Sequence, residues 1–136
     1  MCIQRLDHVN LRTRDLGRSR RFYVEALGLA AVPRDSAKAA GFACGSATQT
    51  FLHIIEATEV DQPAHPPIEH FAFEGIDLRG LMQRLDDHGI AYNLSHRPNE
   101  GLVTVNLRDP DDNRLHVDFA ASEWKAGMVP LRVSAR

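Results

Sequence analysis

An internal repeat is the feature that most limits how this chain can fold. Residues 5–15 return in altered form as residues 67–77, and His8 aligns with His70 at a shift of 62 positions (70 − 8). Both segments carry an apolar residue two positions before the histidine and an Asp-Leu pair beginning seven positions after it. A repeat of this length in a chain of 136 residues predicts one supersecondary unit used twice.

Length and composition indicate an ordinary globular protein. The 136 residues are enough for one domain with a single core, and 43% are apolar while 25% are charged. A net charge of −2 does not favour nucleic acid or an anionic membrane as a partner. We find no apolar run near the roughly 20 residues that span a bilayer and no secretory signal pattern. The two cysteines, Cys2 and Cys44, are too few for a disulfide framework. We therefore expect a cytoplasmic domain whose partner is a small molecule.

The first unit is predicted to have the order β-α-β-β-β. Alternating polarity over residues 3–12 indicates a half-buried strand. Asp15 can cap a helix over residues 16–27, and Gly28 is a suitable stop. Three strands are then predicted at 29–33, 39–44 and 48–57, with turns at 34–36 and 45–46.

The second unit repeats this order after a linker. Three prolines make residues 59–67 unsuitable for a sheet interior. Asp77 can cap a helix that Gly89 ends. The predicted strands cover residues 68–73, 90–94, 102–107 and 114–120, with a turn at 108–113. We predict a single domain over residues 1–136, divided into a first module (about 1–58), a linker (59–67), a second module (about 68–121) and a tail of undecided form (122–136).

Each unit carries two histidines at matching places. His8 and His70 lie on the predicted first strands, and His53 and His116 lie on the predicted last strands, 45 (53 − 8) and 46 (116 − 70) residues later. Their sequence neighbours are apolar and should face the helices, so the four imidazoles should project from the opposite, concave side of each sheet. If the two units pair about a pseudo-twofold axis, all four converge in one cavity as a metal site.

The alternative for any single strand histidine is a surface or hydrogen-bonded core residue. Four histidines at equivalent positions of two repeats are not four independent accidents, which favours the metal site. We assign structural roles to His65 in the linker, His88 at a helix C-terminus and His96 before a loop. The predicted lining of the same cavity consists of Asn10, Phe51, Ile55, Ala72, Tyr92, Val103, Val105 and Asp118.

Several segments resemble the vicinal oxygen chelate superfamily, which includes glyoxalase I, extradiol dioxygenases and bleomycin-binding proteins. They are Leu6-Asp-His-Val9, Arg21-Phe-Tyr-Val-Glu-Ala-Leu-Gly-Leu29, Leu52-His-Ile-Ile-Glu56, Ile68-Glu-His70 and Asp109-Pro-Asp-Asp-Asn-Arg-Leu-His-Val117. These segments span nearly the whole chain. The first helix, with its Phe-Tyr and terminal Leu-Gly-Leu, and the Asp-Pro-Asp-x-Asn turn are specific for the superfamily, but not for any one activity.

The resemblance implies an α+β fold of two paired β-α-β-β-β modules that form a curved, glyoxalase-like half-barrel cup. It implies a homodimer and a divalent metal ion held at four strand positions, here His8, His53, His70 and His116. The family usually has glutamate at the fourth position, so His116 departs from its pattern. Asp112 stands where glycine is customary in the turn, and aspartate tolerates a left-handed backbone better than most residues do.

Four neutral imidazoles would leave the full charge of a divalent ion uncompensated. Such a site suits Zn, Ni or Fe and a Lewis-acid role. It argues against a glyoxalase-like isomerisation, which resembles one that needs a metal-bound glutamate, and against an iron site built from two histidines and a carboxylate. Neither Glu56 nor Asp118 easily replaces the missing carboxylate. One histidine could act as the base instead, and His116 is the candidate catalytic residue.

Three functions are compatible with these observations. The first is a metal-dependent lyase, isomerase or dioxygenase that chelates a small oxygenated substrate. The second is a metal-free protein that binds a small molecule or antibiotic, as bleomycin resistance proteins do. The third is a domain whose histidine-rich cavity has a regulatory or partner-dependent role. Metal content distinguishes the first function from the second.

Overall fold

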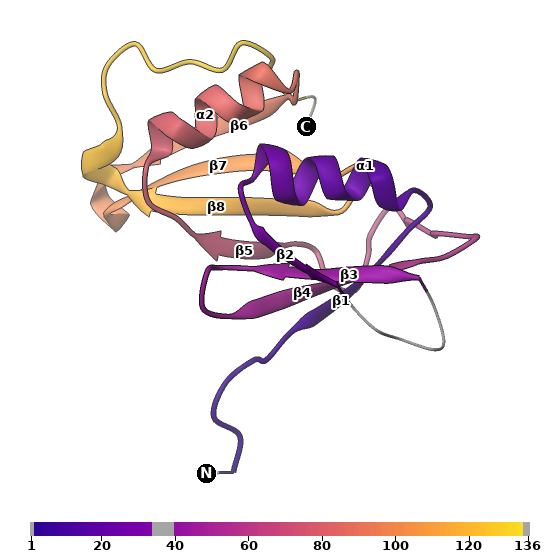
Figure 1. Cartoon of the computed structure of the whole chain (residues 1–136). Helices are drawn as coiled ribbons and strands as arrows, with labels where there is room; N and C mark the ends of the chain where they lie inside the picture. Colours follow the sequence, from indigo (N-terminus) through magenta and orange to yellow (C-terminus); the bar gives the residue numbers. More distant parts are fainter. Residues whose placement is uncertain (1, 34–39, 135–136) are drawn as a thin grey trace. The chain divides into compact units, whose positions relative to one another are not determined.

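The computed structural model describes residues 2–33 and 40–134, and its contacts divide the chain into two units, Met1–Asp61 and Gln62–Arg136. Each unit has one mixed four-stranded sheet and the order β-α-β-β-β (Figure 1). Neither sheet closes into a barrel over the described residues. The predicted α+β class and the two repeated modules are confirmed, while the single domain over residues 1–136 and its module boundaries stay a prediction.

The first and last strands of the first unit lie side by side in its sheet. Its strands are β1 (Val9–Thr13), β2 (Ala30–Pro33), β3 (Gly41–Gly45) and β4 (Thr50–Glu56), in the sheet order β1-β4-β3-β2. Strand β4 pairs parallel with β1 and antiparallel with β3. The helix α1 (Leu16–Arg20) continues as a π-helical segment, η1 (Arg21–Ala26).

Local signals explain the helix of the first unit. The side chain of Asp15 accepts a hydrogen bond from the backbone N–H of Arg18 (3.0 Å), which satisfies a donor that the helix start leaves open. Gly28 has a φ of 80°, and this left-handed backbone ends the helical segment. Tyr23 on the helix and Leu52 and Ile54 on β4 are each 1% exposed and belong to the apolar core.

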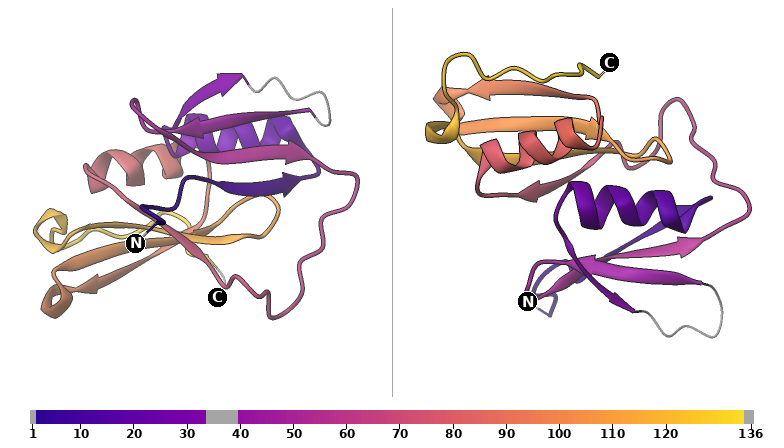
Figure 2. Two further views of the ribbon diagram at one scale, coloured as in Figure 1. Left: turned by 90° about the horizontal axis from the view of Figure 1, so that it is seen from below. Right: turned by 45° about the horizontal axis from the view of Figure 1, so that its top comes forward.

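The second unit repeats this arrangement. Its elements are β5 (Phe71–Glu74), α2 (Leu78–Asp87), β6 (Tyr92–Arg97), η2 (Pro98–Glu100), β7 (Leu102–Arg108), β8 (Arg114–Ala120) and η3 (Ala121–Glu123). The sheet order is β5-β8-β7-β6, with β8 parallel to β5 and antiparallel to β7. Helix α2 lies along one face of this sheet (Figure 2). We call the face of each sheet away from its own helix the open face.

Two acidic side chains hold the start of α2. Asp77 accepts a hydrogen bond from the N–H of Gly80 (3.0 Å), and Glu123 accepts one from the N–H of Leu78 (2.6 Å). The helix turns one apolar stripe inward, as its spacing predicts. The buried residues of this stripe are Leu78, Leu81, Met82 and Leu85.

The first strands begin later than predicted. Strand β1 begins at Val9 and β5 at Phe71, so His8 and His70 each lie just before a strand rather than inside it. An extended segment becomes a strand only where it has a ladder partner, and the parallel ladder with β4 begins at Val9. The predicted turn at 34–36 and the predicted strand start at residue 39 lie outside the described residues.

The tail after β8 has a partly extended form. Trp124 stacks on His96 of β6, with ring centroids 4.4 Å apart. Val133 forms an isolated parallel bridge with Tyr92, so the tail runs along the β6 edge of the second sheet. No helix among the described residues is long and apolar enough to cross a membrane.

The two cysteines should differ sharply in reactivity. Cys44 is fully buried in β3, and burial raises the pKa of its thiol to about 12, whereas Cys2 is exposed. Because the thiolate is the reactive form, a thiol-modifying reagent at about pH 8 should label Cys2 in the native protein and Cys44 only after unfolding. The Cys2→Ser variant is the control and should show no rapid labelling. Equal rates for both thiols in the native protein would contradict the buried position of Cys44.

Candidate functional site

The first unit brings His8 and His53 together on its open face. In the parallel ladder Asn10 pairs with His53, and side chains two residues apart share a face, so His8 lies on the same side as His53. The two rings are stacked, with centroids 4.1 Å apart and an interplanar angle of 19°. The buried neighbours of His53, Leu52 and Ile54, face the other way, into the core.

The second unit brings His70 and His116 together in the same way. Ala72 pairs with His116 in the parallel ladder, which is the register of the first unit repeated. The ring centroids of His70 and His116 lie 4.7 Å apart at an interplanar angle of 42°. Each predicted within-unit pair therefore forms. The two pairs belong to different units, and the convergence of all four histidines stays a prediction.

A carboxylate on the preceding residue engages the first histidine of each pair. His8 Nδ1 lies 2.8 Å from Asp7 Oδ2, and His70 Nδ1 lies 3.1 Å from Glu69 Oε2. The hydrogen bond from His8 is the largest cause that lowers the pKa of Asp7. An ionised carboxylate can only accept, so Nδ1 carries the proton and Nε2 keeps the free lone pair in the neutral ring. This arrangement is the usual one for a metal-binding histidine.

The surroundings of His116 favour its neutral form. Burial lowers the pKa of His116, and this effect outweighs the opposing influence of the Asp118 carboxylate. The neighbouring His70 contributes a smaller lowering of the same pKa. A metal ion binds the neutral imidazole, so the protonation state of His116 suits a ligand.

The donor set fits a transition metal. Two imidazole nitrogens at about 2.0–2.1 Å from one ion place their ring centroids roughly 4.5–5 Å apart. The 4.7 Å separation in the second unit meets this requirement, and the 4.1 Å stack in the first unit needs a small opening of the two rings. Among residues 2–33 and 40–134, no group of three or more His, Cys, Asp or Glu side chains that could hold a metal ion is found.

A polar cavity lies beside the histidines of the second unit. Its volume is about 430 Å³, and its lining includes His70, His116, Asn93, Ser95 and Asn106. Asn106 donates to Ser95 Oγ (3.2 Å), and Asn93 donates to the backbone carbonyl of Ser134 (3.0 Å). These hydrogen bonds order the amides, so the cavity offers fixed hydroxyl and amide groups to a small polar molecule.

Part of the predicted cavity lining was wrong. Tyr92, Val103 and Val105 are each 0% exposed and lie on the face of the second sheet opposite to His116. The ladder pairs Val105 with Val117 and Asn106 with His116, so the open face of β7 carries the even-numbered residues. These three residues belong to the hydrophobic core. Asn10, Phe51, Ile55, Ala72 and Asp118 do share a face with the histidine of their sheet.

Most polar side chains of the open face were not predicted from the sequence. Ser95, Thr104 and Asn106 were not recognised, although a signal for two of them exists. In an antiparallel hairpin centred on Asp111, the positions of paired residues add up to 222, which pairs Thr104 with Asp118 and Asn106 with His116. Because the turn at 108–113 was predicted, the sequence alone gives these two pairs when Asp111 is taken as the centre of the turn.

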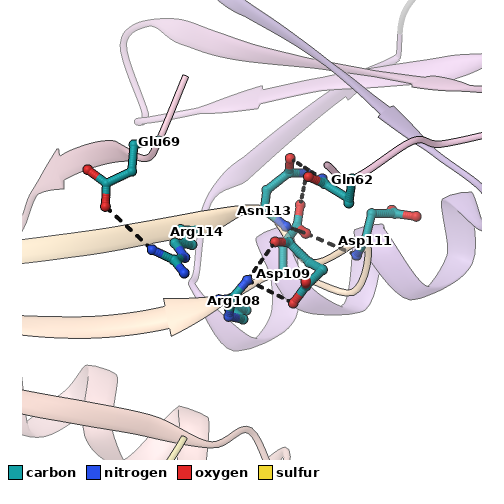
Figure 3. Close-up of polar contacts among 8 residues, drawn as sticks. Gln62, Glu69, Arg108, Asp109, Asp111, Asn113 and Arg114 are labelled. Carbon is teal, nitrogen blue, oxygen red and sulfur yellow. Dashed lines mark hydrogen bonds and ion pairs between the residues drawn. The ribbon is translucent and has the colours of Figure 1, made fainter. Parts of the chain in front are cut away.

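The turn between β7 and β8 fixes the start of β8, two residues before His116. The buried carboxylate of Asp109 accepts hydrogen bonds from the backbone N–H groups of Asp111 (3.0 Å) and Asn113 (2.8 Å) and from the Asn113 amide (2.9 Å) (Figure 3). Gln62 of the linker donates to Asn113 Oδ1 (2.8 Å). Asp112 has a φ of 70°, which confirms that aspartate takes the left-handed position there.

An ion pair next to the turn ties β8 to the start of β5. Arg114 Nη1 lies 3.5 Å from Glu69 Oε1 (Figure 3). The other oxygen of Glu69 contacts His70 Nδ1. Glu69 therefore links a residue of the His116 strand to the ring of His70. At this exposure the Arg114 pair contributes little stability, so we interpret its effect as orientation of Glu69.

Comparisons with known proteins agree on the family. The family model of the Glyoxalase/Bleomycin resistance protein/Dioxygenase superfamily matches residues 5–117. A glyoxylase/bleomycin resistance protein/dioxygenase domain from Frankia has a similar structure, at a TM-score of 0.72 and 22% identity, covering 93% of this chain and 96% of that one. A search of curated protein sequences finds no relative at a significant level of similarity.

Two further solved structures have the same fold. A glyoxalase family protein from Bacillus anthracis matches at a TM-score of 0.70 and 26% identity, covering 87% of this chain and 96% of that one. A fosfomycin resistance protein from Listeria monocytogenes matches at a TM-score of 0.68 and 15% identity, covering 87% of this chain and 94% of that one. A glyoxalase family protein and a fosfomycin resistance protein thus share this fold.

Substitution of Asp109 should test the turn that positions His116. Asp109→Ala leaves two backbone N–H groups and the Asn113 amide without their acceptor, and we expect it to lower the free energy of unfolding by about 2–3 kcal/mol. Urea denaturation measures this loss. The matched control is Asp112→Gly in the same turn. It removes an exposed ion pair with Arg108 but relieves a left-handed aspartate, so its effect should be near zero. Equal effects of the two substitutions would contradict this account of the turn.

Proposed function

Because the chain belongs to the glyoxalase/bleomycin resistance protein/dioxygenase superfamily, we propose that it is a metal-dependent enzyme that acts on a small oxygenated organic substrate. The observation that carries this proposal is the matching histidine pair in each unit, with Nδ1 of His8 and of His70 engaged by an adjacent carboxylate. The fold can form without these histidine–carboxylate contacts, whereas a metal site needs partners that orient its histidine ligands.

The four histidines are the proposed ligands of a Zn, Ni or Fe ion. His8 and His53 supply two nitrogens from the first unit, and His70 and His116 supply two from the second. When bound, the ion supplies Lewis-acid polarisation of substrate oxygens. The protein holds the rings in place, since Asp7 and Glu69 set the tautomers of His8 and His70.

The remaining polar groups would bind and orient the substrate. The cavity beside His70 and His116 presents Ser95 and Asn106, and their mutual hydrogen bond limits how each can turn. The site has His116 where the family usually has glutamate, so His116 is our candidate for moving a proton. Lyase, isomerase and dioxygenase types all remain open, since no carboxylate ligand selects one of them.

A metal-free protein that binds a small molecule or an antibiotic is the second candidate. The cavity of about 430 Å³ and its ordered amide groups favour it, because they offer hydrogen bonds that need no metal ion. We also propose a cytoplasmic homodimer, on the basis of the family resemblance and the two unpaired thiols.

Metal content should separate the two candidates. Protein purified without a histidine tag should contain, or take up on titration, about one Zn, Ni, Co or Fe ion per chain, as expected for a set of neutral imidazole ligands. Elemental analysis and calorimetric titration measure this. The binding should be lost at low pH, when the imidazoles are protonated. Failure to take up any of these ions would end the metal-dependent proposal and favour the second candidate.

Removal of one ligand should test the convergence of the four histidines. His70→Ala should weaken metal affinity by at least about tenfold, because it removes one of four proposed donors. His65→Ala, a histidine of the same unit outside the proposed site, is the matched control and should leave the affinity unchanged. Competition with a chelator measures both. If His70→Ala binds as tightly as the wild type, the four-histidine site is wrong.

A further inference from the structure

A row of three polar side chains crosses the open face of the second sheet and ends at His116. Arg97 Nη2 donates to Thr104 Oγ1 (2.9 Å), and Thr104 Oγ1 donates to Asp118 Oδ1 (2.6 Å). The other carboxylate oxygen, Asp118 Oδ2, lies 3.4 Å from His116 Nε2. We call Arg97, Thr104 and Asp118 the Asp118 row.

The direction of these hydrogen bonds leaves one carboxylate oxygen of Asp118 available to His116. Thr104 is 1% exposed, and its hydroxyl has a single proton. Arg97 can only donate, so Thr104 accepts from Arg97 and gives its proton to Asp118. One carboxylate oxygen is thereby occupied and held, and the second faces the ring of His116. The side chains of His116 and Asp118 are only 20% and 25% exposed, so water competes weakly for this contact.

The contact with Asp118 distinguishes the two nitrogens of His116. A carboxylate beside Nε2 favours the neutral tautomer with its proton on Nε2, which leaves the lone pair on Nδ1. This is the reverse of His8 and His70, whose Nδ1 atoms face carboxylates. The distance of 3.4 Å is longer than that of a full hydrogen bond, and contacts of this kind are often long before a site is occupied.

The first unit shows that the fold does not need this row. Asp118 lies two residues after His116, and the matching residue after His53 is Ile55. In the ladders, Gly41 pairs with Ile55 as Thr104 pairs with Asp118. A side chain at Gly41 would overlap with the backbone carbonyl of Ile54, so the first unit has no room for a threonine there. The same sheet therefore forms with isoleucine and glycine in place of the row.

We propose that Asp118, held by Thr104 and Arg97, is a positioning residue that sets the tautomer and the orientation of the His116 imidazole. Its role is to present Nδ1 of His116 to a metal ion or a substrate. The consequence for metal binding rests on the proposed function, whereas the tautomer itself does not. The Asp118 row thus positions His116, the histidine that departs from the family pattern.

The tautomer can be measured in the metal-free protein. Long-range proton–nitrogen NMR of the 15N-histidine-labelled full chain, above the pKa of its histidines, reports which ring nitrogen carries the proton. His116→Gln identifies the His116 signals by their loss. We expect the Nε2–H tautomer for His116 in the wild type. Asp118→Asn and Thr104→Val should weaken or reverse this preference, and Thr104→Ser, which keeps the hydroxyl, should restore it.

Cobalt affinity provides the second readout. Competition with a chelator should show about tenfold to a hundredfold weaker Co²⁺ binding for Asp118→Asn and Thr104→Val, the range for loss of an outer partner of a metal ligand. Thr104→Ser should bind as the wild type does. Urea denaturation of each variant separates this effect from a loss of folding.

The outcomes distinguish the two proposals. If the wild type takes up no Co²⁺ but the tautomer of His116 responds to the substitutions, the metal function fails and the positioning role of Asp118 stands. If the wild type binds Co²⁺ and folded Asp118→Asn changes neither the tautomer nor the affinity, the positioning role is overturned. A wild-type His116 with its proton on Nδ1 would overturn it as well.

Discussion

The parallel pairing of the first and last strand of each unit is the constraint on which the histidine geometry depends. In both ladders, the residue two positions after the first histidine is the partner of the second histidine, Asn10 with His53 and Ala72 with His116. Side chains two positions apart share a face, so the register alone brings each pair of rings to within 5 Å. A slip of one residue would turn the second histidine into the core. The apolar neighbours of His53 and His116 prevent that slip, because they must remain buried.

The two units use the same backbone for different purposes on their open faces. The first has Ile55 and Gly41 at the places where the second has Asp118 and Thr104. Ordering a chain of polar side chains on a sheet costs free energy unless each one has a hydrogen-bond partner. Here Arg97, Thr104 and Asp118 each have one. The proposed enzyme site, unlike a symmetric metal clamp, needs one distinguishable side. The unequal open faces provide that asymmetry at His116.

Periodicity predicted the order and type of the elements well but predicted their faces less reliably. The strands around the turn at 108–113 were placed within a residue or so, yet Val103 and Val105 were assigned to the wrong face. The two faces of a strand that is buried on its helix side and polar on the other can be assigned from the sequence only where polar and apolar residues alternate strictly. In β7, Thr104 is also buried, at 1% exposure, so exposure alone does not separate the two faces. The alternation of Thr104, Asn106 and Arg108 with Val103, Val105 and Leu107 does separate them, and the ladder with β8 agrees.

The sequence by itself determined the duplicated unit, its β-α-β-β-β order and the four histidine positions, because repeats, caps and hydrophobic spacing act over a few residues. Tertiary structure decided which groups meet across strands. The contacts of Thr104 with Asp118 and of Arg97 with Thr104 join residues 14 and 7 positions apart through the ladders of β6, β7 and β8. Such contacts depend on strand register, which is set when the whole core packs. His116 and Asp118 were both singled out in the sequence, while the hydrogen bonds that hold Asp118 beside His116 became visible only in the folded sheet.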